Sequence, residues 1–206
     1  MYMPRYFFID RIIVALLVMS STSVSSIASD SEGRFAVRNA GMVTCEKFIE
    51  EKNKKSPQFN LYMGWIDGYL SAANQFTEKT FDLVPWGNTV LLATLIENHC
   101  ETNKDQHFYV AVNQLAAAMM KDRIIEHSEL IKTEHDGNKT YVYQEVLMRM
   151  QKVLKKEKLY RGKPDGKYGQ GTRKAIIEFQ KSHKLAVTGL PDQLTLYYMF
   201  IKLPKL

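Results

Sequence analysis

The sequence lacks the residue patterns from which common catalytic and metal centres are built. Its five histidines form no H-E-x-x-H motif or comparable zinc-binding cluster; they are His99, His107, His127, His135 and His183. No serine lies in an S-x-x-K or G-x-S-x-G setting, where serine nucleophiles are commonly found. We therefore expect no metal, no cofactor and no recognisable catalytic residue.

The sequence also lacks an apolar run of the roughly 18 to 20 residues that are needed to span a bilayer. A shorter run, Ile12 to Met19, follows Arg5 and Arg11 and precedes Ser26-Ile27-Ala28, a small-x-small cleavage pattern. These features predict that residues 1–28 are an export signal and that the mature chain has no transmembrane segment. An uncut N-terminal anchor is the alternative.

Cysteine occurs only twice, at Cys45 and Cys100. In a reducing compartment this pair would indicate little, but in an exported protein it predicts one disulfide bond rather than a free catalytic thiolate. The bridge would close a loop of 55 residues, a large constraint for a small domain.

With 206 residues the chain is long enough for one ordinary domain or two small ones, and the resemblance of its C-terminal motif, described below, favours two. We predict a mainly α-helical protein. After the signal come a polar arm at residues 29–40, a disulfide-closed four-helix domain at 41–121, a linker or short β-hairpin at 122–143, and a three-helix domain at 144–206.

The four N-terminal helices are predicted from apolar spacing and capping residues. The first begins near Val43 or Thr44, the second runs from Gln58 to Phe76, Asn88 caps the third, and Asp105 caps the fourth. The second helix is predicted to bury a broad face. It contains Gly64 and Gly68 one turn apart, which predicts close approach of another helix there.

The C-terminal domain is predicted from the segment PDGKYGQGTRKAIIEFQ, residues 164–180. Asp165 suits an Asx-turn, Gly166 and Gly169 suit positive φ, and Thr172 suits the N-cap of the helix that follows. The last helix is expected at Asp192 to Phe200, and the first begins at Gln144.

These residues resemble the peptidoglycan-binding domain attached to bacterial cell-wall hydrolases. The family pattern consists of a helix, D-G-x-[FY]-G-x-x-T-x-x-A-[VI]-x-x-F-Q, then V-T-G and a last helix. It is met at Asp165 to Gly169, Thr172, Ala175, Ile176, Phe179-Gln180 and Val187 to Gly189. The resemblance implies a three-helix fold and peptidoglycan as the partner.

The resemblance also implies a shallow binding groove beside the loop. Sugar rings would stack on aromatic side chains and stem-peptide carboxylates would meet basic ones. The predicted site residues are Tyr160, Arg161, Lys163, Asp165, Lys167, Tyr168, Thr172 and Arg173. Asp165 and Thr172 are equally the residues that the fold needs for its turn and cap.

The two halves of the mature chain carry opposite charge. Residues 146–206 hold 14 lysines and arginines against 4 acidic residues, a net charge of +10, whereas residues 29–145 have a net charge of −5. A basic surface outside the cytoplasm attracts wall carboxylates, lipid phosphates or lipopolysaccharide rather than nucleic acid. Lys155, Lys156 and Lys158 are more simply a solvated face.

The N-terminal helices resemble, more loosely, the periplasmic HdeA-like proteins and the Tai-type immunity proteins. The resemblance rests on residues 45–48, 65–70, Asn74, 95–100 and 108–112, and it implies a fold and a compartment.

These features predict a non-catalytic, periplasmic or secreted protein that anchors a chaperone-like or accessory domain to the cell wall. Two alternatives stay open. A wall hydrolase would use paired carboxylates such as Asp67 and Glu97, although each is more simply a structural charge. In a scaffold or immunity component of a secretion or envelope complex, the binding fold would serve only as a protein scaffold and would not bind the wall. The N-terminal domain is the expected site of a protein partner.

Overall fold

The computed structural model of the chain describes residues 29–203. The predicted export signal, residues 1–28, lies outside the described residues. Contacts divide the chain into a unit that ends at Ala36 and a second unit, Val37–Leu206. In the first unit the carboxylate of Asp30 accepts hydrogen bonds from the backbone N–H groups of Glu32 and Arg34. All helices and strands described within residues 29–203 belong to the second unit.

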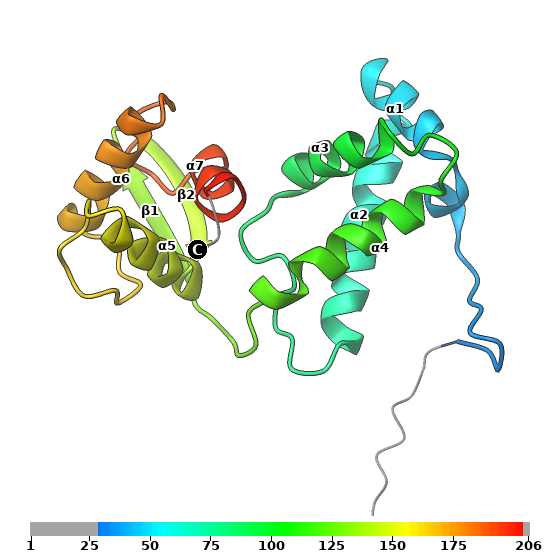
Figure 1. Cartoon of the computed structure of the whole chain (residues 1–206), viewed down its shortest axis with the longest axis horizontal. Coiled ribbons are helices and arrows are strands. Elements are labelled where there is room, and N and C mark those ends of the chain that lie inside the picture. The colour runs from blue at the N-terminus through cyan, green and yellow to red at the C-terminus, as the bar shows by residue number, and fades with distance from the viewer. Residues whose placement is uncertain (1–28, 204–206) are drawn as a thin grey trace, which may run out of the picture. The chain divides into compact units, whose positions relative to one another are not determined.

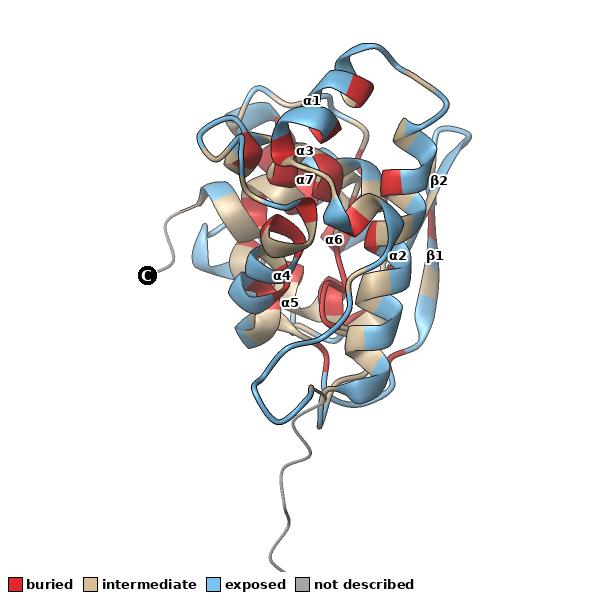
Figure 2. Ribbon diagram, turned by 90° about the vertical axis from the view of Figure 1, so that its right-hand side faces the viewer, coloured by how far each residue is buried: buried red, intermediate tan, exposed pale blue. Residues whose placement is uncertain are grey.

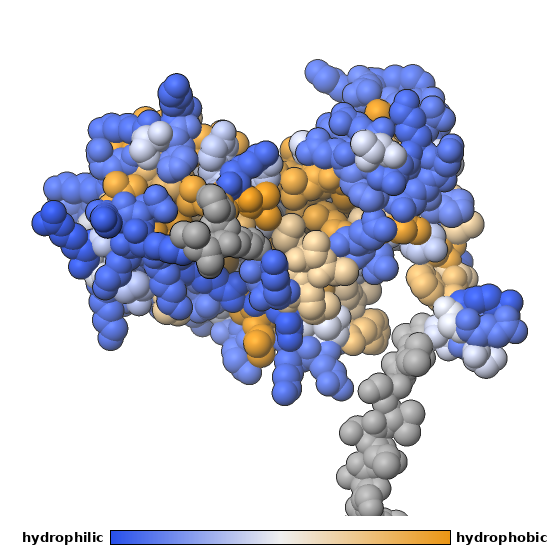
Figure 3. Space-filling model, viewed as in Figure 1, coloured by the Kyte–Doolittle hydropathy of each residue, from blue (hydrophilic) through white to orange (hydrophobic). Residues whose placement is uncertain are grey.

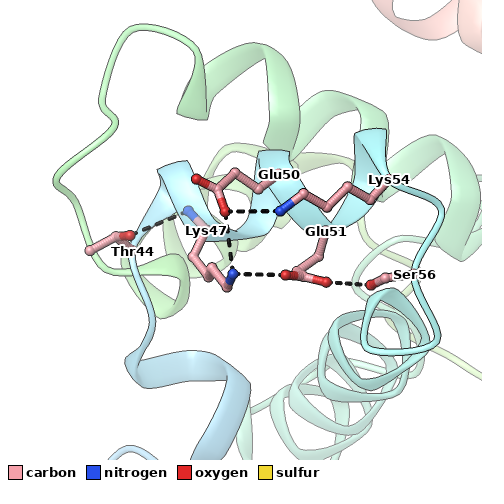
Figure 4. Close-up of polar contacts among 6 residues, drawn as sticks. All are labelled: Thr44, Lys47, Glu50, Glu51, Lys54 and Ser56. Carbon is pink, nitrogen blue, oxygen red and sulfur yellow. Dashed lines mark hydrogen bonds and ion pairs between the residues drawn. The ribbon is translucent and has the colours of Figure 1, made fainter.

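Helix α1 (Cys45–Asn53) follows a short 3-10 turn, η1 (Asn39–Met42), and begins as predicted. Thr44 caps it by accepting a hydrogen bond from the backbone N–H of Lys47 at 3.3 Å. Figure 4 shows the ion pairs along this helix, in which Lys47 lies between Glu50 and Glu51 while Glu51 also accepts from Ser56. Because Glu51 is almost fully buried, this bonding ties the end of α1 to the turn before the next helix.

Three longer helices complete this part of the chain: α2 (Phe59–Phe76), α3 (Thr89–Cys100) and α4 (Phe108–Met119). Figure 1 shows them grouped with α1, which we call the four-helix segment. At its centre Phe48, Tyr62 and Phe108 form an aromatic triad with ring centroids 4.7 to 5.3 Å apart. Offset and tilted aromatic pairs of this kind stabilise a core beyond the area they bury.

The predicted helix caps are partly confirmed. Asn88 caps α3, since its side-chain oxygen accepts from the backbone N–H of Leu91 at 2.9 Å. The prediction for α4 is wrong, because the helix begins at Phe108 and its N-cap residue is His107, not Asp105. The backbone of Phe108 instead donates to the carbonyl of Val43, so a tertiary contact sets this start.

The disulfide joins Cys45 to Cys100, as predicted, and both residues are fully buried. It connects the first residue of α1 to the last residue of α3 across 55 positions of sequence. The bond therefore fixes the end of α3 to the start of α1. Phe48 of the aromatic triad lies one turn further along α1.

Helix α2 packs the predicted face against the core. Tyr62 and Ile66 are buried, and the partly buried residues packed beside them are Phe59, Trp65, Tyr69, Leu70 and Ala73. The rest of its ribbon is intermediate or exposed (Figure 2). The prediction for its glycines is wrong, because they do not receive another helix. Outside the helix's own backbone, no described atom lies within 4 Å of where a Cβ of Gly64 or Gly68 would stand.

Alanine at Gly64 and Gly68 should therefore stabilise the protein. Glycine inside an exposed helix costs roughly 0.5 to 1 kcal/mol relative to alanine, so each substitution is expected to raise the free energy of unfolding by that amount. Urea unfolding followed by circular dichroism measures it. The matched control is Gly41→Ala, whose Cβ would lie 2.5 Å from the Trp65 ring, so this substitution should destabilise the protein. A lower free energy of unfolding for Gly64→Ala would contradict the exposed position of Gly64.

The loop between α2 and α3 is held by a partly buried carboxylate, Asp82. Its side chain accepts from the backbone N–H of Val84 at 3.0 Å, and its backbone pairs with Ile124. Burial raises the pKa of Asp82 above its usual 3.8, and the hydrogen bonds from Val84 and Asn74 oppose that rise only in part.

This raised pKa predicts a pH dependence of stability. The folded state holds the Asp82 proton more tightly than the unfolded state, so its contribution is fully present below about pH 3.8 and is lost as pH rises through the folded pKa. Asp82→Asn should abolish the fall in the free energy of unfolding that Asp82 causes as pH rises, while it keeps an oxygen acceptor for the backbone N–H of Val84. Urea midpoints at closely spaced pH values test it, and parallel curves for both proteins would contradict it.

The predicted hairpin is confirmed in residues 122–143. Strand β1 (Leu130–His135) pairs antiparallel with β2 (Asn138–Tyr143), and Leu130 lies opposite Tyr143. Asp136 and Gly137 both have positive φ, as a two-residue hairpin turn of this kind requires.

The C-terminal segment begins directly after the hairpin, and its described residues form helices joined by two loops. Helix α5 (Gln144–Lys156) is followed by α6 (Gln170–Ser182), and α7 (Gln193–Tyr197) continues into a π-helical turn at Tyr198–Lys202. Its core contains buried apolar side chains from each helix, namely Leu147, Met150, Leu154, Ile176, Phe179, Leu196 and Met199. This is the three-helix arrangement that the sequence predicts.

Candidate binding surface

The loop between α5 and α6 is organised by one buried amide, Gln151. Its side-chain oxygen accepts from the backbone N–H groups of Asp165 and Gly166, both at 2.8 Å. Its nitrogen faces the carbonyl of Lys167 and the hydroxyl of Thr172, each at 3.0 Å. Because backbone N–H groups only donate, the atom that faces them must be the oxygen, and this fixes the orientation of the amide.

A second buried amide, Gln180, organises the loop between α6 and α7 in the same way. Its oxygen accepts from the backbone N–H of Gly189 at 2.9 Å, and its nitrogen faces the hydroxyls of Thr188 and Thr195, both at 2.9 Å. Both glutamines have no exposed surface. A buried amide that meets backbone groups on both of its atoms is costly to remove, so each loop is held in one conformation.

The two loops are joined by Tyr168. Its hydroxyl donates to the carbonyl of Gly189 at 2.7 Å, and burial raises the pKa of this phenol. Tyr160 is held locally, since its hydroxyl donates to the carbonyl of Lys163 and its ring lies against Gly162. Both predicted sugar-stacking tyrosines are therefore half-buried and fixed, with their hydroxyl groups already used by the protein.

Asp165 forms the predicted Asx-turn. Its carboxylate accepts from the backbone N–H of Lys167 at 3.0 Å, and this hydrogen bond holds the pKa of Asp165 below its usual value. Gly166 has the expected positive φ of 70°. Asp165 is thus used to shape the loop.

Two of the predicted loop features are wrong. Thr172 is not the N-cap of α6, because the helix begins at Gln170 and Gly169 is its N-cap residue. Gly169 itself has a φ of −116°, so it needs no left-handed conformation. Thr172 is buried instead, and its hydroxyl donates to the carbonyl of Lys167 while it accepts from Gln151.

The basic residues of the loop differ in exposure. Arg161, Lys163 and Lys167 are exposed, whereas Arg173 is half-buried at the start of α6. Within residues 29–203 no ion pair joins any of these four side chains to an acidic residue. Figure 3 shows the surface over α5 and this loop as almost entirely hydrophilic. The structure thus places exposed cations beside fixed tyrosines, which suits a polar, anionic ligand.

The residues considered for catalysis are used for structure. Asp67 accepts a hydrogen bond from the hydroxyl of Thr89 at 2.6 Å, and Glu97 forms an ion pair with Lys52. Thr89 and Glu97 lie eight residues apart on α3, about 12 Å along the helix. No cluster of three histidine, cysteine, aspartate or glutamate residues that could hold a metal is found in residues 29–203, and none of the helices described there is long and apolar enough to cross a membrane.

The C-terminal segment is a small helical domain whose two loops are each held by a buried glutamine. Residues 144–199 match the family described as "Putative peptidoglycan binding domain". This match confirms the resemblance drawn from the sequence for the C-terminal segment. No curated protein and no solved structure matches the chain, so the resemblance of the four-helix segment to HdeA-like and Tai-type proteins stays a prediction.

The role of the two glutamines was missed by the sequence prediction, although a signal was present. Gln151 occupies an apolar position of its helix, four residues after Leu147 and three before Leu154. Gln180 likewise follows Ile176 by four residues. A polar amide in an apolar stripe, followed by a glycine-containing loop, indicates a buried hydrogen-bond centre.

Proposed function

We propose that this chain is a non-catalytic peptidoglycan-binding protein of the bacterial envelope. Its C-terminal segment would attach the four-helix segment to the cell wall, where that segment acts as a chaperone-like or accessory domain. The match of residues 144–199 to a peptidoglycan-binding family supports the partner, and it favours a periplasmic or secreted location in contact with the wall.

The loop supports a division of labour in this binding. The rings of Tyr160 and Tyr168 would meet sugar rings, while Arg161, Lys163 and Lys167 would meet the carboxylates of stem peptides. Since Gln151 holds the loop before any ligand arrives, little conformational entropy is lost on binding. Asp165 and Thr172 would act by positioning the loop, and Arg173 would border it.

Co-sedimentation of the purified full chain with purified cell-wall sacculi tests this proposal. The test variant carries Arg161→Glu, Lys163→Glu and Lys167→Glu. Roughly tenfold less of this variant than of the unmodified chain should sediment with the sacculi, because each lost charged contact weakens binding. The matched control carries Lys152→Glu, Lys155→Glu and Lys156→Glu on the exposed face of α5, the same change of charge at a different surface.

The outcomes separate the candidate functions. A large loss of sedimentation in the loop variant, together with a small loss in the control variant, supports a specific binding site. Equal losses would indicate general charge attraction, and failure of the unmodified chain to sediment would favour a protein-binding scaffold. Release of soluble wall fragments that stops in Asp67→Asn or Glu97→Gln would instead identify a hydrolase.

A further inference from the structure

We propose that the four-helix segment holds a second ligand site, for an uncharged acetamido sugar, in a pocket between turn η1 and helix α2. The pocket has a volume of about 640 Å³, within the range of small-molecule sites. Its lining combines an aromatic and aliphatic floor with amide groups, and it consists of Asn39, Ala40, Val43, Gln58, Leu61, Tyr62 and Trp65.

The floor is rigid because Trp65 is fixed on several sides. Its indole N–H donates to the carbonyl of Arg38 at 3.0 Å, so the polar edge of the ring is already used. The ring stacks on Tyr69 with centroids 5.3 Å apart and meets Phe108 edge-on at 5.7 Å. Gly41 lies directly against it, and a Cβ at that position would come within 2.5 Å of the indole. What Trp65 contributes to the pocket is therefore an immobile apolar surface.

The polar side-chain groups of the pocket are the hydroxyl of Tyr62 and two carboxamides, those of Asn39 and Gln58. Both carboxamide residues are exposed, and neither side chain makes a hydrogen bond to another described residue. Each amide offers a donor and an acceptor to a ligand. Asn39 is held in the left-handed region with a φ of 47°, a conformation that asparagine tolerates better than most residues.

The lining contains no charged residue, although the adjacent helix α1 carries a dense cluster of ion pairs (Figure 4). A charged ligand would therefore enter the apolar floor without compensation, which is costly. A purely apolar side chain would cover the two carboxamides and leave them without partners. The lining thus favours a neutral ligand that has both apolar and amide character.

An acetamido sugar has that character. Its methyl group and the C–H faces of its ring suit the aromatic and aliphatic floor, while its amide and hydroxyl groups match the donors and acceptors of Asn39 and Gln58. A site of this kind on the four-helix segment is independent of the C-terminal loop and does not rest on the function proposed for it.

Titration of the full chain with a β-1,4-linked tetramer of N-acetylglucosamine tests the site. The chain has two tryptophans, and Trp86 is buried, so a Trp86→Phe variant makes Trp65 the only source of tryptophan emission. We expect a saturable change in this emission and a matching calorimetric isotherm. Because the ligand is uncharged, both should be the same at low and high salt.

Matched variants locate the binding. Gln58→Ala and Asn39→Gly should each weaken binding roughly three- to tenfold, as the loss of one hydrogen bond predicts, and glycine accepts the positive φ at position 39. Gln75→Ala, at an exposed glutamine near the other end of α2, should bind as the unmodified chain does.

Several results would overturn the proposal. The first is the absence of a saturable signal at 10 mM tetramer, and the second is equal affinity for the tetramer in all variants. The third is an apolar dye that binds at Trp65 and is not displaced by the sugar. That result would indicate a groove for an apolar peptide. The loop variant Arg161→Glu, Lys163→Glu, Lys167→Glu should keep tetramer binding. Failure of the pocket is therefore distinguishable from failure of the wall-binding loop.

Discussion

Replacement of both Cys45 and Cys100 by serine is expected to lower the free energy of unfolding by about 4 kcal/mol, the value that chain entropy gives for a closed loop of 55 residues. The bond constrains the unfolded chain from the start of α1 to the end of α3. Since small domains are stable by only about 5 to 15 kcal/mol, this loss is a large share of the total. Guanidinium unfolding followed by tryptophan emission measures it.

Chemical reduction of the unmodified chain provides the control for this variant. Reduction removes the cross-link without changing the buried side chains, so it should reproduce most of the loss seen with serine. A reduced protein as stable as the oxidised one would mean that the cross-link does little to constrain the unfolded chain. A serine variant far less stable than the reduced protein would instead assign the loss to buried hydroxyls next to Phe48.

Substitution of Gln151 by leucine is expected to cost about 3 kcal/mol, although leucine is apolar and close in size. The backbone N–H groups of Asp165 and Gly166 would lose their acceptor, and an unsatisfied buried donor costs roughly 1 to 3 kcal/mol. The loss should appear as a lower urea midpoint. The substitution should also reduce the amount of protein that sediments with sacculi, since the loop that carries Lys163 and Lys167 would no longer be held in one conformation.

Two other variants give this prediction a matched comparison. Gln170→Leu changes the same residue type at an exposed position, the first residue of α6, and should leave stability within about 0.5 kcal/mol. Gln180→Leu should cost as much as Gln151→Leu, because it removes the acceptor for Gly189. Little loss at either buried glutamine would show that the loops are held by their turns alone.

The loop between α5 and α6, which we propose binds the wall, and the proposed sugar pocket differ in chemistry. The loop offers exposed cations beside fixed tyrosines, whereas the pocket offers neutral amides above an indole. The loop would meet stem-peptide carboxylates through its cations and sugar rings through its tyrosines, whereas the pocket would meet an acetamido sugar without any charge. Binding to whole sacculi should therefore respond to salt only in part. This expectation follows from the two proposals together, and each has its own test.

Much of the fold could be predicted because the signals are local. Thr44 and Asn88 cap their helices through side chains a few residues away, Asp136-Gly137 forms the hairpin turn, and Asp165 forms its Asx-turn. The pairing of Cys45 with Cys100 followed from the presence of only two cysteines. In each case the energetic preference is contained within a few neighbouring residues or leaves no alternative.

The predictions that were wrong depend on distant parts of the chain. Whether Gly64 and Gly68 meet another helix depends on how α3 and α4 cross α2, and the start of α4 depends on a hydrogen bond to Val43. Thr172 has the residue type of an N-cap, yet Gln151 from the preceding helix draws its hydroxyl into the core. Local propensities of about 1 kcal/mol are outweighed by such buried contacts.

The sequence by itself determined the helical class and the hairpin, because capping, turn chemistry and apolar spacing act over short distances. It determined the disulfide because it has only two cysteines, and the peptidoglycan-binding motif through its resemblance to a family pattern. Only the tertiary structure decided that Gln151 and Gln180 hold the loops, that Thr172 is buried and Arg161, Lys163 and Lys167 are exposed, and that Trp65 forms the floor of a pocket under η1. The physical reason is that burial and hydrogen-bond partners are set by residues far apart in sequence, and these decide which side chains remain available to a ligand.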